Sequence, residues 1–171
     1  MKNSNISCQC QERRRGFAKD SNNLMFHPHK PIYKDHFGAG LDKRPRTGDF
    51  YIEIGVEKSL FAGGLWRPSP KVLRSIRDAI DYNGEELKKI LNKPSFKKRF
   101  GGLYEDEKLK TAPRGFSNDH PHLDLLRHKT FAVSLTFSTD RVFQKDFEDF
   151  LFATYFEMLP FRTYLNKALS V

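Results

Sequence analysis

Residues 50–57, FYIEIGVE, alternate apolar and polar side chains with a period of two. Successive side chains of a β-strand point to opposite faces, so this alternation predicts a strand with one buried face. The segment FAVSLTFS, residues 131–138, repeats the pattern. We expect strands at 49–57, 59–66 and 131–137, with the first two forming a hairpin. Such strands require a core on one side of a sheet.

Helical signals fill most of the remaining chain. Ser69 is a suitable N-cap and Pro70 suits the first helical position, whereas Asn83 and Gly84 are typical of a helix end. Aromatic residues from Phe143 onward recur at spacings of three and four, which predicts a buried helical stripe that Pro160 breaks. Helices are therefore expected within residues 70–100 and 143–170.

Strands with hairpin spacing and helices in blocks favour an α+β fold over an alternating βαβ fold. We predict a single domain in which a short mixed or antiparallel sheet packs against helices. Residues 1–25 are expected to form an irregular basic tail, and residues 26–171 the α+β domain. The 16 phenylalanines of the chain require a core of this kind.

The net charge of +9 is unevenly distributed, with +6 in residues 1–48 and +3 in the rest. A basic leader attracts polyanions weakly whatever its role, so charge alone is poor support for nucleic-acid binding. Cys8 and Cys10 are interpreted as free thiols of the tail. The chain has no apolar run that could span a membrane and no signal-peptide pattern, so a cytoplasmic protein without membrane partners is expected.

The segment HKPIYKDHFGAG, residues 29–40, concentrates several kinds of hydrogen-bond donor. Lys34 and His36 could converge on a phosphate or a carboxylate, because ammonium and imidazole groups both bind anions. The alternative is a loop that enters a strand, with solvated charges and with glycines that set the turn. Both interpretations remain open.

A second group lies in LKTAPRGF, residues 109–116, where Lys110 and Arg114 flank the backbone of Gly115. Loops held by a rigid scaffold often carry binding residues, although plain turns have the same composition. Gly63 and Gly64 could let a ligand approach the backbone, with Trp66 as a stacking face. The alternative for these three residues is a bulge beside a core tryptophan.

Other chemistry has less support. His27 and His29, like His120 and His122, are separated by one proline, which directs the two imidazoles of an extended segment to opposite faces rather than to one ion. We therefore predict no metal site and no cofactor, and we interpret His120 and His122 as helix-start and surface residues. Nucleophile and phosphate-loop motifs are absent.

Several motifs occur in the order found in one family: KPIYKDHFGAG, FYIEIGVEKSLFAGGLWRPSP, LRSIRDAI, FKKRFGGLYEDEKLKTAPRGFSNDHPHLDLLRHKTFAV and LPFRTYLNKAL. On these segments the chain resembles the domain of unknown function 2461, a family of conserved hypothetical proteins of bacteria and fungi, over residues 26–171. The usual N-terminal helical segment of that family is expected to be missing. The resemblance implies no activity.

The sequence thus favours an uncharacterised protein that binds an anionic small molecule in a basic, aromatic-edged pocket formed by Lys34, His36, Trp66, Lys110 and Arg114. Whether it also acts as an enzyme is left open, as is its oligomeric state. A second hypothesis is a nucleic-acid accessory protein whose basic leader and residues 97–99 contact phosphates. A third is a truncated family member without activity.

Overall fold

The computed structural model describes residues 29, 33–40, 50–105 and 107–169. The elements are, in chain order, β1 (His36–Gly40), β2 (Tyr51–Gly55), β3 (Lys58–Leu65), α1 (Pro70–Asn92), α2 (Pro94–Phe100), α3 (Leu123–Leu126), β4 (Phe131–Ser138), the 3₁₀ helix η1 (Thr139–Phe143) and α4 (Phe147–Ala168). The predicted single α+β domain is confirmed. The boundary predicted at residue 25, the two cysteines and His27 lie outside the described residues.

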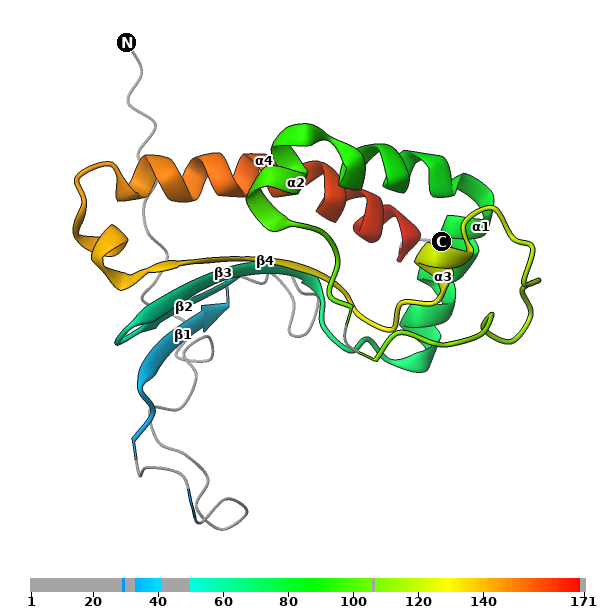
Figure 1. The fold of residues 1–171 in the computed structure, drawn as a ribbon, viewed down its shortest axis with the longest axis horizontal. Coiled ribbons are helices and arrows are strands. Elements are labelled where there is room, and N and C mark those ends of the chain that lie inside the picture. The colour runs from blue at the N-terminus through cyan, green and yellow to red at the C-terminus, as the bar shows by residue number, and fades with distance from the viewer. Residues whose placement is uncertain (1–28, 30–32, 41–49, 106, 170–171) are drawn as a thin grey trace.

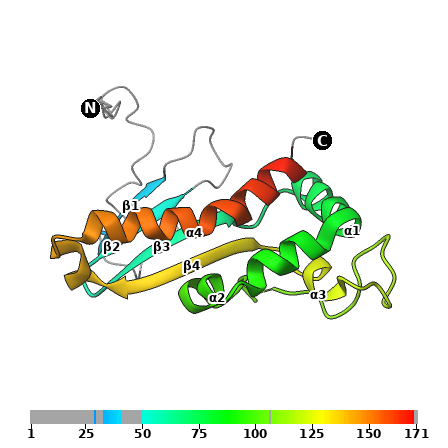
Figure 2. The ribbon, with the colours of Figure 1, turned by 90° about the horizontal axis from the view of Figure 1, so that it is seen from above.

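The four strands form one antiparallel sheet in the order β1-β2-β3-β4. The long helices lie on one face of this sheet, with α4 running above it (Figure 1). From above, α4 follows the length of the sheet, and α1 lies beside the C-terminal end of α4 (Figure 2). The other face carries no described helix, and we call it the open face.

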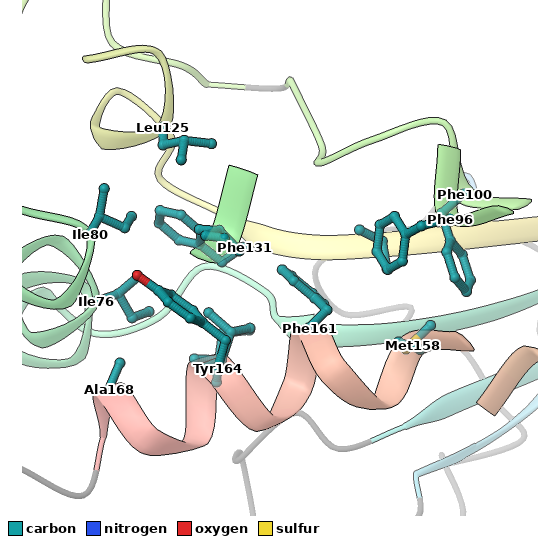
Figure 3. Close-up of a cluster of buried hydrophobic side chains, with 14 of the residues drawn as sticks. Ile76, Ile80, Phe96, Phe100, Leu125, Phe131, Met158, Phe161, Tyr164 and Ala168 are labelled. Carbon is teal, nitrogen blue, oxygen red and sulfur yellow. The ribbon is translucent and has the colours of Figure 1, made fainter. Parts of the chain in front are cut away.

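The core lies between the sheet and the helices. Phe131 and Val133 of β4 are fully buried, as the alternation predicted, and Phe161 of α4 packs above them. Figure 3 shows the inward side chains of α1, α2 and α4 converging on this layer. Burying one such side chain contributes about 1.5–3 kcal/mol, so this interlocked layer is the main source of stability.

Strand β1 corrects the interpretation of residues 36–40 as a loop. His36–Gly40 pairs with β2 along its whole length. The sequence did not reveal this strand because its one large apolar side chain, Phe37, is 77% exposed. Because the buried residue of this strand is Gly38, no apolar alternation marks the segment.

The helix end predicted at Asn83 and Gly84 is a kink within α1, where two helical segments meet. Asn83 departs from helical geometry (φ −145°, ψ 50°), but the helix resumes at once after a kink. The Tyr164 hydroxyl donates a hydrogen bond of 3.2 Å to the Asn83 carbonyl. Figure 3 shows this hydroxyl directed toward α1. A contact from α4 thus satisfies a carbonyl that the kink leaves free, and local residue preferences do not reveal such a contact.

Helix α4 also corrects two predictions. It continues through Pro160, and Phe143, expected in its buried stripe, is 82% exposed in η1. Pro160 lies on the exposed side of the helix, whereas Met158 before it and Phe161 after it are fully buried. Packing on both sides of the proline outweighs the hydrogen bond that it lacks. Among the described residues, no helix has the length and apolar character needed to cross a membrane.

Candidate functional site

Trp66 follows the last residue of β3 and is 54% exposed, so it is not the core tryptophan that the alternative interpretation required. The Tyr104 ring meets it edge-on, with centroids 4.8 Å apart and an interplanar angle of 88°. The Arg67 guanidinium lies 5.9 Å from the indole centroid and pairs with Glu107. We call these four residues, Trp66, Arg67, Tyr104 and Glu107, the aromatic corner. It presents a fixed indole beside a charged pair.

Both members of that charged pair have unusual backbones. Among the described residues, Arg67 (φ 43°) and Glu107 (φ 63°) are the non-glycine residues with positive φ. Such conformations cost of the order of 1 kcal/mol or more each and concentrate at functional sites. The two strained residues are ion-paired to each other beside the exposed indole. This coincidence marks the aromatic corner as the leading candidate site.

The segment that carries Tyr104 is anchored from behind. The Tyr104 backbone N–H donates to the Ala132 carbonyl at 3.1 Å, and His128 Nδ1 lies 3.0 Å from the Tyr104 carbonyl. His128 is buried. Burial and the nearby Lys108 ammonium lower the pKa of His128 below its ordinary value. A neutral imidazole therefore donates to the Tyr104 carbonyl and holds the segment in place.

Lys110, Arg114 and Gly115 lie on the irregular segment between α2 and α3. All three are exposed, and Gly115 has a φ of 95°. Lys110 and Arg114 make no ion pair or side-chain hydrogen bond with any other described residue. Both cations are thus available to a ligand.

The two predicted glycines of β3 are buried, and one of them makes the predicted close approach. Gly64 has a φ of 108°, and a Cβ there would collide with the Phe131 carbonyl of β4. Gly63 pairs with Val133 in regular register. Gly64 brings two backbones together and so fixes the end of β3 that leads into Trp66.

Lys34 and His36 lie at the start of β1, at the far side of the sheet. His36 Nδ1 is 2.8 Å from Asp35 Oδ1, and its Nε2 is 3.7 Å from Glu53 Oε2. The Tyr51 hydroxyl donates to that same Glu53 oxygen at 2.8 Å. Burial and Glu53 raise the pKa of Tyr51 to about 12, so its hydroxyl stays protonated.

The structure therefore divides the predicted site residues into two groups. Strand β1 lies toward one end of the molecule, and the segment between α2 and α3 runs from its middle toward the other end (Figures 1 and 2). Lys110 and Arg114 share that segment with Tyr104 and Glu107 of the aromatic corner, whereas Lys34 and His36 lie just before β1 and at its start.

His120 and His122 correct their interpretation as surface residues, because His122 is 7% exposed and the ring of His120 is mostly buried as well. His120 Nδ1 accepts the His122 backbone N–H at 3.0 Å, so its Nε2 carries the proton that faces Asp81 at 2.8 Å. The His122 ring lies flat on Gly84 at the kink of α1, and its buried Nδ1 has no hydrogen-bond partner. These contacts fasten the segment before α3 to α1.

Sequence reasoning missed five residues around these sites, and Arg67, adjacent to the predicted Trp66, is one of them. Tyr51 and Glu53 carried a signal, since they occupy the polar positions of the alternating strand. Tyr104 and Glu107 carried none, because only the tertiary fold brings them to Trp66. Among the described residues, no three His, Cys, Asp or Glu side chains are placed to hold a metal ion.

A family model described as Conserved hypothetical protein (DUF2461) matches residues 9–164. The chain belongs to this family. The match covers the aromatic corner and both groups of predicted site residues, and it begins ahead of residue 26, where the range of the predicted resemblance starts. No curated protein and no solved structure matches the chain. Membership in the DUF2461 family names no activity, so the function must be inferred from the residues of the chain.

Proposed function

We propose that this DUF2461 protein binds an anionic small molecule at the aromatic corner. The observation that carries the proposal is the pairing of strained Arg67 with strained Glu107 beside the half-exposed Trp66. Strain of this kind persists only where the surrounding structure enforces it. The indole of Trp66, which is 54% exposed, offers aromatic surface to a planar or ring-shaped ligand group.

The expected negative charge of the ligand follows from two cations on the segment that also carries Tyr104 and Glu107. Lys110 and Arg114 are exposed without partners among the described residues. Glu107 neutralises the Arg67 guanidinium, so Arg67 adds little net charge to the site. Its role is to position a ligand group by hydrogen bonding. Each exposed charge contact contributes up to about 1 kcal/mol, which corresponds to roughly fivefold in affinity. Two such contacts favour a phosphate or a carboxylate over a neutral group.

The nucleic-acid alternative depends on the basic leader, which lies outside the described residues, and on residues 97–99, of which Lys97 and Lys98 are exposed on α2. Their neighbour Arg99 donates through Nη1 to Thr154 Oγ1 at 2.7 Å, so it is occupied within the fold. Surface lysines of this kind, together with the charges of the leader, would give non-specific phosphate contacts with a steep salt dependence. Small-molecule binding should therefore depend on Lys110 and Arg114 and survive moderate salt. Nucleic-acid binding should depend on the lysines of α2 and be lost in salt.

The experiment is thermal unfolding with phosphate, sugar phosphates, sugar acids, nucleotides and short oligonucleotides at low and moderate salt. A ligand at 100 times its Kd adds about 2.7 kcal/mol of stability, a rise in melting temperature of roughly 5–10 °C for this size of chain. We expect such a rise with a small anion, surviving moderate salt and reduced by Lys110→Gln and Arg114→Gln.

The matched control is Lys98→Gln, which removes one exposed cation from α2 and leaves the aromatic corner intact. It should not change the rise in melting temperature. A rise in melting temperature only with oligonucleotides, abolished by salt and by Lys98→Gln, would contradict the proposal and support nucleic-acid binding. No rise with any anion would contradict the proposal and support an inactive family member.

A further inference from the structure

The exposed side of α4 carries two phenylalanines that lie outside the core. Phe152 is 48% exposed and Phe156 62% exposed, whereas Met158 and Phe161 on the inner side of the same helix are fully buried. Phe152 and Phe156 are four residues apart, so their side chains are neighbours on one face of the helix. A surface helix normally confines its apolar side chains to the face that meets the core. The second apolar face of α4 therefore indicates a further contact.

A groove lies beside Phe156, between α4 and the second half of α1. Its volume is about 440 Å³, and its lining includes Lys89, Ile90, Phe156, Leu159, Pro160 and Thr163. Most of these side chains are apolar. The Phe156 ring meets the Tyr155 ring with centroids 5.3 Å apart and an interplanar angle of 75°, so it has a defined place at the groove. A groove of this kind suits an aromatic side chain of a protein partner.

The charged residues near this face are divided by sign. Glu148 and Asp149 are exposed in the first turn of α4, and Lys167 is exposed in its last turn. Lys89 lines the groove beside the C-terminal half of α4. None of these four side chains makes an ion pair in the part of the chain that the structure describes. The helix dipole favours this placement of charge, and it leaves an acidic end and a basic end open to a partner.

An antiparallel pair of α4 helices matches both the apolar residues and the charges. The exposed residues of one helix face follow one another at spacings of three and four: Asp149, Phe152, Phe156, Pro160, Thr163 and Lys167. A two-fold axis near residue 158 places Asp149 of one copy opposite Lys167 of the other, because both are nine residues from that position. The same axis places Phe156 opposite Pro160, and Phe152 opposite Thr163 at the groove.

We propose that this face of α4 binds a second copy of the chain, with the two α4 helices antiparallel and Phe152 of each copy at the groove of the other. A two-fold interface is self-complementary, so every contact occurs twice. A parallel pair would instead bring Asp149 against Asp149. The contact is dominated by two helices, so we expect a weak dimer with a Kd of about 1–100 µM. The interface is independent of ligand binding at the aromatic corner.

The test is analytical ultracentrifugation of the full chain over a range of concentrations. We expect a monomer–dimer equilibrium in which Phe152→Asp and Phe156→Asp each raise the dimer Kd at least tenfold, because each change places two carboxylates in an apolar contact. The matched control is Phe143→Asp, which alters a phenylalanine that is 82% exposed on η1, outside this face. It should leave the Kd unchanged. Each variant should keep the wild-type melting temperature at a concentration where the wild type is monomeric, which shows that it folds.

A charge exchange tests the antiparallel register. Asp149→Lys and Lys167→Asp each bring like charges together and should raise the Kd roughly fivefold or more. The double variant pairs the charges again with their signs reversed, so its Kd should return close to the wild-type value. A monomer at every concentration up to about 500 µM, or a dimer that Phe156→Asp leaves intact, would overturn the inference. A double variant that dimerises no better than the single variants would overturn the antiparallel pairing.

Discussion

At the scale of single residues, contacts between distant segments decide what each side chain does. Glu107 and Arg67 hold left-handed backbones and meet each other, although 40 residues separate them. Gly84 is a glycine because the His122 ring occupies the space of a side chain. Neither relation has a local signature, since the sequence around Gly84 is typical of an ordinary helix end. The sequence could therefore predict residue types suited to a site but not their partners.

The strain at Glu107 can be measured by comparing two replacements. Glu107→Ala and Glu107→Gly both remove the pair with Arg67, but only glycine relieves the left-handed backbone (φ 63°). We expect the glycine variant to be more stable than the alanine variant by about 1 kcal/mol in denaturant unfolding. Equal stabilities would show that the backbone at this position is not strained.

Gly84→Ala tests the contact that fastens His122 to α1. A Cβ at this position would lie 2.5 Å from His122 Cδ2, so the ring must shift. We expect a loss of about 1–3 kcal/mol in the free energy of unfolding, as for other overpacked sites. Gly102→Ala is the control, because a Cβ there meets nothing within 4 Å. A loss no larger than that of the control would mean that the contact is loose.

The buried imidazole of His128 predicts a pH dependence. Its pKa is lowered in the folded protein, so the unfolded chain binds a proton more readily. The contribution of neutral His128 is fully present above its unfolded pKa of about 6.5 and is lost as the pH falls through the lower folded value. In His128→Asn, melting temperature should fall less steeply below pH 6.5 than in the wild type. Parallel curves would contradict this role.

At the scale of elements, the alternation of apolar and polar residues predicted the strands that pack against the helices. Strands β2, β3 and β4 were predicted within a few residues, because each places apolar side chains against the helices. Strand β1 was missed because it buries no large side chain, and α4 was predicted to break at Pro160 because propensity ignores burial on either side. The two halves of the predicted site separated for a similar reason. Strand order places β1 at one edge, and no local pattern encodes strand order.

Pro160→Ala tests whether α4 tolerates its proline at a cost. Pro160 is exposed and lies inside the helix, so alanine restores one backbone hydrogen bond without altering the core. We expect the free energy of unfolding to rise by about 1–2 kcal/mol. Pro94→Ala should give no such gain, since Pro94 occupies the first turn of α2, where no intrahelical partner is lost. A destabilised Pro160→Ala protein would overturn this interpretation.

At the scale of the whole molecule, the helices and the aromatic corner have separate roles. The helices bury one side of the sheet and supply the stability of the domain. The aromatic corner carries the exposed indole, and Lys110 and Arg114 follow Tyr104 and Glu107 on the segment between α2 and α3. The proposed ligand would place a ring on Trp66 and its charge against these two cations.

Trp66 is the single tryptophan of the chain, so its fluorescence reports on the corner alone. The most direct test is a titration of this emission with the small anions, in the wild type and in the Lys110→Gln/Arg114→Gln double variant. The account predicts a saturable change for at least one anion, with a Kd raised about 10- to 25-fold in the double variant. Ligand binding that leaves Trp66 emission unchanged, or equal affinity in both proteins, would contradict it.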